Sequence, residues 1–97
     1  MEISIKRIAG GADTGGQGET VYGLVVAALK EHQFVVLDFA GVQTATSSFV
    51  NAALVQMLDL HSFDEIKRRV RVVRSTRQIN EMIKSRLERE ASRRSAA

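Results

Sequence analysis

Four hydroxyl side chains lie close together near the middle of the chain, at Thr44, Thr46, Ser47 and Ser48. They follow an apolar run and precede a segment with helical periodicity, so we expect them at a helix N-terminus. Unpaired N–H groups and the helix dipole at such a terminus stabilise an added phosphate. Simple N-capping would also explain these residues. This segment is the strongest candidate for function in the sequence.

A glycine-rich segment spans residues 10–18 and holds five glycines in nine residues. Its N–H groups could converge on an anion in front of the next helix. A P-loop, however, ends in Gly-Lys-Ser/Thr, whereas this chain has Gly18-Glu19-Thr20, with a carboxylate in the place of the lysine. We therefore expect a mobile loop, and an anion nest that senses a small molecule is the least supported alternative.

Residues suited to catalysis are scarce. His32 and His61 are the only histidines, each near the end of a predicted helix, and neither has a second ligand at a metal-binding spacing. The chain has no cysteine and no Gly-x-Ser-x-Gly elbow. Asp38 ends an apolar run, where we expect it to accept hydrogen bonds from the following loop. The sequence thus predicts a non-enzymatic protein without a cofactor or a metal site.

Charge is distributed unevenly along the chain. Residues 1–66 carry three basic and eight acidic side chains, a net charge of −5, and residues 67–97 carry eleven basic and three acidic ones, a net charge of +8. A polyanion could bind this basic part, and the candidate residues are Arg68, Arg69, Arg71, Arg74 and Arg77. The stretch lacks base-stacking aromatics, and three glutamates interrupt it. We therefore favour a solvated helix face or an acidic protein partner over nucleic acid.

Periodicity divides the chain into six alternating elements. Two-residue and apolar patterns predict strands at 3–8, 34–39 and 70–73, and the middle strand is expected to be covered on both faces by helices. Helical patterns predict helices at about 19–30, 48–61 and 75–92, the last one basic. The order β-α-β-α-β-α indicates an α/β sandwich with a mostly parallel sheet of three to four strands flanked by helices.

Length and composition are those of a small globular protein. A chain of 97 residues with 44% hydrophobic and 26% charged residues forms one core, so we expect a single domain over residues 1–97. The longest apolar runs are too short to span a bilayer, which needs about 20 residues. No basic, apolar secretory signal opens the chain. We expect a cytoplasmic protein that does not associate with membranes.

One block of sequence resembles a known family. Residues Phe34-Val35-Val36-Leu37-Asp38-Phe39-Ala40-Gly41-Val42, followed by Ser47-Ser48-Phe49, are similar to the core signature of STAS domains, and particularly of the STAS-like family of uncharacterised function. The resemblance covers about residues 20–80. Thr46 stands where the common STAS pattern has aspartate, and Phe49 stands where it has glycine.

The resemblance implies a bacterial regulatory module related to anti-sigma factor antagonists, in which a serine of this block is phosphorylated by a partner kinase and releases a bound protein. Ser47 or Ser48 would be that serine here. The implied partner is a cytoplasmic protein such as a histidine-kinase-like ATPase or an anti-sigma-like regulator. The candidate partner-binding residues are Asp38, Thr46, Ser47, Ser48, Phe49 and Asn51. Polyanion binding through the arginines is the alternative function.

Overall fold

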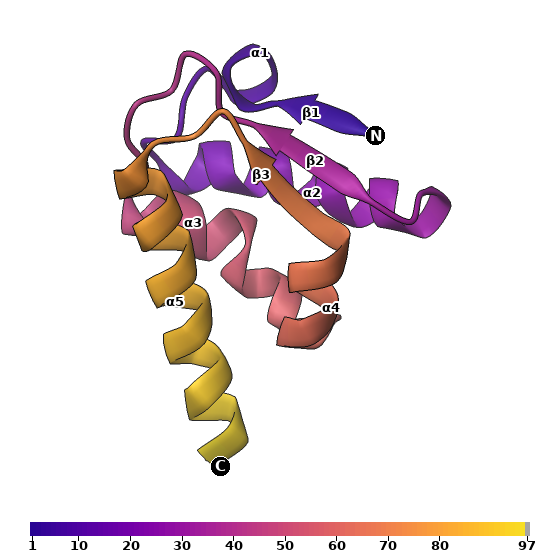
Figure 1. Ribbon diagram of the computed structural model, residues 1–97. Helices are drawn as coiled ribbons and strands as arrows, with labels where there is room; N and C mark the ends of the chain where they lie inside the picture. Colours follow the sequence, from indigo (N-terminus) through magenta and orange to yellow (C-terminus); the bar gives the residue numbers. More distant parts are fainter. Residues whose placement is uncertain (97) are drawn as a thin grey trace.

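Three short parallel strands form the sheet of the computed structural model, which describes residues 1–96 (Figure 1). They are β1 (Glu2–Ser4), β2 (Val35–Asp38) and β3 (Val70–Val73), and they lie side by side in the order β1-β2-β3. Ile3 is paired with Leu37, and Leu37 with Val72. The predicted parallel α/β sheet is confirmed, and a fourth strand does not occur within residues 1–96. Residue 97 of the predicted domain lies outside the described residues.

Helices fill the connections between the strands. They are α1 (Ile5–Ala9), α2 (Gly15–Glu31), α3 (Ser47–Ala53), the 3-10 helix η1 (Val55–Asp59), α4 (Phe63–Arg69) and α5 (Arg77–Ala96). The expected strands and helices thus occur in the expected order, but α1 and α4 are additional, so the simple β-α-β-α-β-α order is incomplete. The last helix extends beyond the predicted end at about residue 92.

The first strand is shorter than predicted. Instead of continuing to residue 8, the chain turns into α1 at Ile5, because the Ser4 hydroxyl accepts a hydrogen bond from the N–H of Arg7 at 3.3 Å and caps the helix. Gly10 ends this helix in the left-handed conformation, with φ of 83°. Ile8 is consequently exposed, whereas Ile3 and Ile5 are buried.

The glycine-rich segment is not the predicted mobile loop. Thr14 caps α2 through a capping box, accepting from the N–H of Gln17 at 3.1 Å while the Gln17 amide oxygen accepts from the N–H of Thr14 at 3.0 Å. The same Gln17 amide donates to the carbonyl of Ala9 at 3.1 Å. Gly15, Gly16 and Gly18 therefore lie inside the first turn of α2 rather than in a flexible linker.

The predicted helix at 48–61 is divided in two. It ends as α3 at Ala53 and continues as η1, and the polar connection that follows forms α4. A second capping box starts α4: the N–H of Glu65 donates to the Ser62 hydroxyl at 3.1 Å, and the Glu65 carboxylate accepts from the N–H of Ser62 at 3.3 Å. The Ser-x-x-Glu spacing was visible in the sequence.

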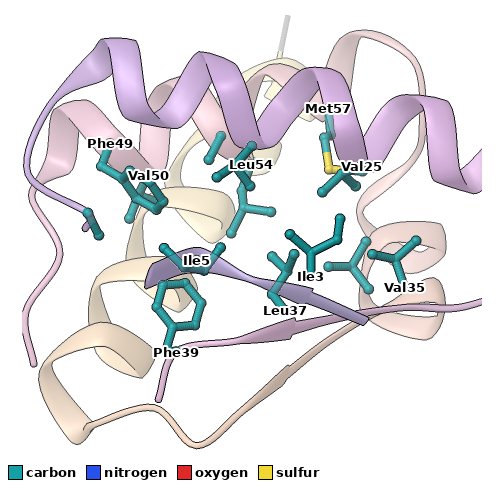
Figure 2. Packing of buried hydrophobic residues seen from close by; sticks show 14 of the residues in the cluster. Ile3, Ile5, Val25, Val35, Leu37, Phe39, Phe49, Val50, Leu54 and Met57 are labelled. Atoms are coloured by element: carbon teal, nitrogen blue, oxygen red, sulfur yellow. The ribbon is translucent and has the colours of Figure 1, made fainter. Parts of the chain in front are cut away.

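The helices gather on one face of the sheet, which corrects the expectation that β2 is covered on both faces. Consecutive parallel strands joined by right-handed crossovers place their helices on the same side. Accordingly, α2 contacts α3, and α5 contacts both α3 and α4. Val35 and Leu37 point into this layer and are fully buried, whereas Val36 and Asp38 on the other face are half-buried. Figure 2 shows the core between α2 and the sheet.

Glycine at position 18 permits the close packing of α2 against α3. A Cβ atom there would lie 2.5 Å from the carbonyl oxygen of Phe49 and 2.8 Å from the Cβ of Ala52. Both distances are far below van der Waals contact, and one involves backbone that cannot rotate away. The helices must therefore separate if any side chain larger than hydrogen is present.

Substitution of Gly18 by alanine is expected to lower the free energy of unfolding by about 2–4 kcal/mol, because overpacking outweighs the gain in helix propensity. Gly23 is the matched control on the same helix, since its Cβ would meet nothing within 4 Å. Gly23→Ala should leave stability unchanged or raise it by up to about 1 kcal/mol. Urea denaturation of both variants measures the difference, and equal effects would contradict the packing argument.

Candidate functional site

The hydroxyl-rich segment is anchored to the start of α2. Thr46 is the N-cap of α3, and its hydroxyl accepts from the N–H of Phe49 at 3.1 Å. The same hydroxyl donates to the carbonyl of Asp13 at 3.0 Å, and the N–H of Thr46 donates to the carbonyl of Ala12 at 3.0 Å. Thr46, which stands where the common STAS pattern has aspartate, thus caps α3 and also binds the loop in front of α2.

The start of α5 holds the same segment from a second direction. The Gln78 amide pairs with both backbone groups of Ala45, accepting from its N–H at 2.9 Å and donating to its carbonyl at 3.0 Å. The Thr76 hydroxyl donates to the carbonyl of Gln43 at 2.8 Å. The loop between β2 and α3 is therefore held both by the segment in front of α2 and by the start of α5.

The candidate residues of α3 fall into two groups. Ser48 is exposed and Ser47 is half-buried, and neither hydroxyl makes a side-chain hydrogen bond within residues 1–96. Phe49 is fully buried, packing edge-on against Phe39 with 6.4 Å between ring centroids. Phe49 is therefore a core residue and is removed from the predicted partner-binding surface, whereas the two serines remain accessible.

A polar hollow of about 630 Å³ lies between α3 and α5. Ser48 and Asn51 line it from α3, and Arg86 and Arg89 line it from α5. The Arg86 Nε donates to the Asn51 side-chain oxygen at 3.2 Å, which joins the two walls. Both arginines belong to the basic part of the sequence but are not among the candidate residues named there, although their spacing of three residues on an amphipathic helix places them on the same face.

Some of the arginines that line the hollow are paired with carboxylates, and others are not. Arg94 lies 2.8 Å from the Asp59 carboxylate and 3.2 Å from that of Glu90, and Arg93 lies 3.1 Å from Glu90. Within residues 1–96, Arg86 and Arg89 form no ion pair. Positive charge is consequently left over beside Ser48 and Asn51. The arrangement is suited to binding an anionic group.

A protein-family model matches residues 17–80, about two thirds of the chain, and is described as a STAS-like domain of unknown function (DUF4325). The chain belongs to this family. No curated protein and no solved structure shows a significant match to it. The match confirms the resemblance carried by the Phe34–Val42 and Ser47–Phe49 block. In this STAS-like domain the serines and Asn51 lie inside the matched region, whereas Arg86 and Arg89 lie beyond it.

Asp38, the remaining candidate for partner binding in the STAS-like domain, lies apart from the serines. Its side chain points to the open face of the sheet, where its two oxygens accept from Nε and Nη2 of Arg74, each at 2.9 Å. Arg74 also reaches Glu2 on β1 at 3.3 Å. Arg74, which makes this bidentate contact, has a φ of 51°, in the left-handed region that is uncommon for a non-glycine residue.

The five arginines proposed for polyanion binding have separate roles. The Arg69 guanidinium donates to the carbonyls of Leu29, His32 and Gln33 at 2.8–3.1 Å and so caps the end of α2. Arg74 is paired with Asp38, and Arg71 lies 4.8 Å from the centre of the Phe34 ring. Arg68 and Arg77 are exposed. Arg69 and Arg74 are thus hydrogen-bonded to other groups of the chain, and Arg71 lies over an aromatic ring.

The two histidines lie at structural positions. His32 follows α2 as its C-cap, and His61 lies 3.8 Å from the Glu65 carboxylate. The residues that the structure describes contain no group of three or more His, Cys, Asp or Glu side chains placed to hold a metal ion. None of the helices in residues 1–96 is both long enough and apolar enough to cross a membrane.

The contact between Asp38 and Arg74 makes stability depend on pH. Hydrogen bonds from Arg74, and then from the N–H of Ala40, lower the pKa of Asp38 below its ordinary value. A carboxyl group with a lowered folded-state pKa stabilises the fold above its unfolded-state pKa, and this stabilisation is lost as pH falls through the folded-state pKa.

Wild type should therefore be more stable than Asp38→Asn at neutral pH, and the difference should shrink as pH falls from about 5 to about 3. Urea denaturation at a series of pH values measures it. Asp13→Asn is the control, because its carboxylate makes no ion pair within residues 1–96. A difference between wild type and Asp38→Asn that stays constant over this range would refute the assignment.

Proposed function

We propose that this STAS-like domain is a non-enzymatic regulatory module that binds a protein partner. The proposed surface consists of Thr46, the N-cap of α3, together with Ser47, Ser48 and Asn51 of α3 and Arg86 and Arg89 of α5. The observation that carries the proposal is the hollow itself, in which the exposed Ser48 lies beside two arginines that form no ion pair within residues 1–96. Binding is favoured over catalysis because neither histidine, the usual general base for a serine, lines this hollow.

The charge of the surface indicates the class of partner. Its leftover positive charge complements an acidic protein surface, which raises association rates and excludes partners of the wrong sign. The family suggests a regulatory role, and a histidine-kinase-like ATPase or an anti-sigma-like regulator in the cytoplasm is the partner that we propose. Asp38 is not part of this surface, because its carboxylate is bound to Arg74 on the other face of the sheet.

Phosphorylation would act on the same charges. A phosphate on Ser48 adds about −1.5 to −2 charge within the hollow that Arg86 and Arg89 line. Charge-assisted hydrogen bonds to these arginines would neutralise the groups that attract an acidic partner. In this proposal phosphorylated Ser48 competes with the partner, and phosphorylation releases it. Ser47 is the second acceptor site, since it is only half-buried.

Support for polyanion binding is weaker. Arg69 and Arg74, two of its five proposed residues, already bind groups of the chain itself. Arg77 belongs to this set but not to the hollow, and it is exposed at the start of α5. Reversing the charge of Arg77 therefore tests polyanion binding without altering the hollow proposed for the protein partner.

Arg89→Glu should weaken binding of the specific partner about tenfold or more, because reversing a charge in a complementary interface costs at least about 1.4 kcal/mol. Arg77→Glu should leave this binding unchanged. The measurement is quantitative affinity purification from the native cells with each variant as bait, followed by titration of the purified partner. Salt-sensitive heparin or duplex DNA binding that Arg77→Glu abolishes would instead establish polyanion binding.

Intact mass spectrometry of the protein isolated under phosphatase inhibition should show a fraction heavier by about 80 Da, with the phosphate located on Ser48 or Ser47 by fragmentation. Ser48→Asp should reduce partner binding, whereas Thr20→Asp, a hydroxyl residue on the exposed side of α2, should not. Unmodified protein under all growth conditions would rule out the switch and leave constitutive docking.

A further inference from the structure

A second, apolar hollow of about 440 Å³ lies between α4, β3 and α5. Its walls include Leu54, Ile66, Val72, Ile83 and Leu87. This volume falls within the range of about 300–1,000 Å³ that is typical of small-molecule sites, which are likewise lined mainly by apolar side chains. It shares no residue with the hollow between α3 and α5.

The hollow results from the way in which the chain leaves the sheet. β3 is an edge strand, with α4 leading into one end and α5 starting beyond the other (Figure 1). α5 packs against α3 and η1 as well as α4, so it does not close over the outer side of β3. Val72 and Ile83 pack against the core but are only half-buried. Apolar side chains thus line a recess that is open to solvent.

The polar side chains at this hollow indicate the charge of an occupant. Lys67 lines it from α4 and Lys84 from α5, whereas Glu88 is its only carboxylate. Within residues 1–96, Lys84 forms no ion pair. Lys67 lies 3.8 Å from the Asp64 carboxylate, and both side chains are largely exposed, so this pair is weak and easily exchanged. Two ammonium groups can therefore approach an anion from opposite walls.

We propose that this hollow binds a small amphipathic carboxylate, with an apolar body of medium chain length in contact with Val72, Ile83 and Leu87 and its carboxylate between Lys67 and Lys84. The volume is sufficient for a small molecule of this kind. Apolar contact supplies most of the affinity, and the two lysines select for negative charge. This site is independent of the docking surface proposed above.

The test uses the protein of residues 1–97 and decanoate below its micellar concentration, with binding followed by amide chemical shifts in NMR. Saturable shifts should be confined to α4, β3 and the facing turns of α5. Decanoate should bind about threefold to tenfold more tightly than decanol, and decyltrimethylammonium more weakly than either. Lys84→Glu should weaken decanoate binding about tenfold and leave decanol binding unchanged.

Lys30→Glu is the matched control, because Lys30 is an exposed lysine on α2 away from this hollow. Ile83→Phe places a larger side chain in the hollow at a half-buried position and provides a second test that does not depend on charge. This variant should weaken the binding of decanoate and of decanol equally. Absence of saturable binding, equal affinity for the three amphiphiles, or shifts centred on other elements would overturn the proposal. None of these results depends on whether a protein partner binds α3.

Discussion

The contact between α2 and α3 at Gly18 is the constraint on which the rest of the structure depends. A single hydrogen atom at this position lets the carbonyl of Phe49 approach the axis of α2 more closely than any side chain permits. This approach brings Phe49 over the sheet and against Phe39. It also brings the start of α3 close enough for Thr46 to bind the backbone of Ala12 and Asp13. The position of the serines therefore depends on a glycine thirty residues earlier in the chain.

Short apolar runs and helical periodicity allowed much of this architecture to be predicted from sequence. The strands at Val35–Asp38 and Val70–Val73 follow from short runs rich in valine, and the helix after Thr76 follows from its helical pattern. The alternation of Ile3, Ile5 and Ile8 misled the prediction because a short capped helix buries Ile5 as effectively as a strand does. A local pattern cannot distinguish two elements that bury the same side chain.

Long-range contacts explain the other differences. Five glycines indicate flexibility when their neighbours are unknown, but the hydrogen bonds of Gln17 order this segment, and the face of α3 requires glycine at position 18. Similarly, Phe49 fits a binding surface by its place beside the serines, and only packing against Phe39 reveals it as core. Arg86 lies 35 residues from Asn51, so their contact depends on the crossing of α3 and α5. Residue types were enough to select the serines as candidate site residues, whereas the arginines beside them could be found only from the tertiary packing.

The capping of α2 by Arg69 constrains the order in which the chain can fold during synthesis. The carbonyls of Leu29, His32 and Gln33 receive their donor from a residue about forty positions later. Until Arg69 has left the ribosome, water must solvate these carbonyls, and the end of α2 can fray. Arg69 immediately precedes β3, so the same step that completes the helix also delivers the last strand. A nascent chain that ends before Arg69 lacks both the capped end of α2 and the strand β3. The sheet and the end of α2 are therefore completed together.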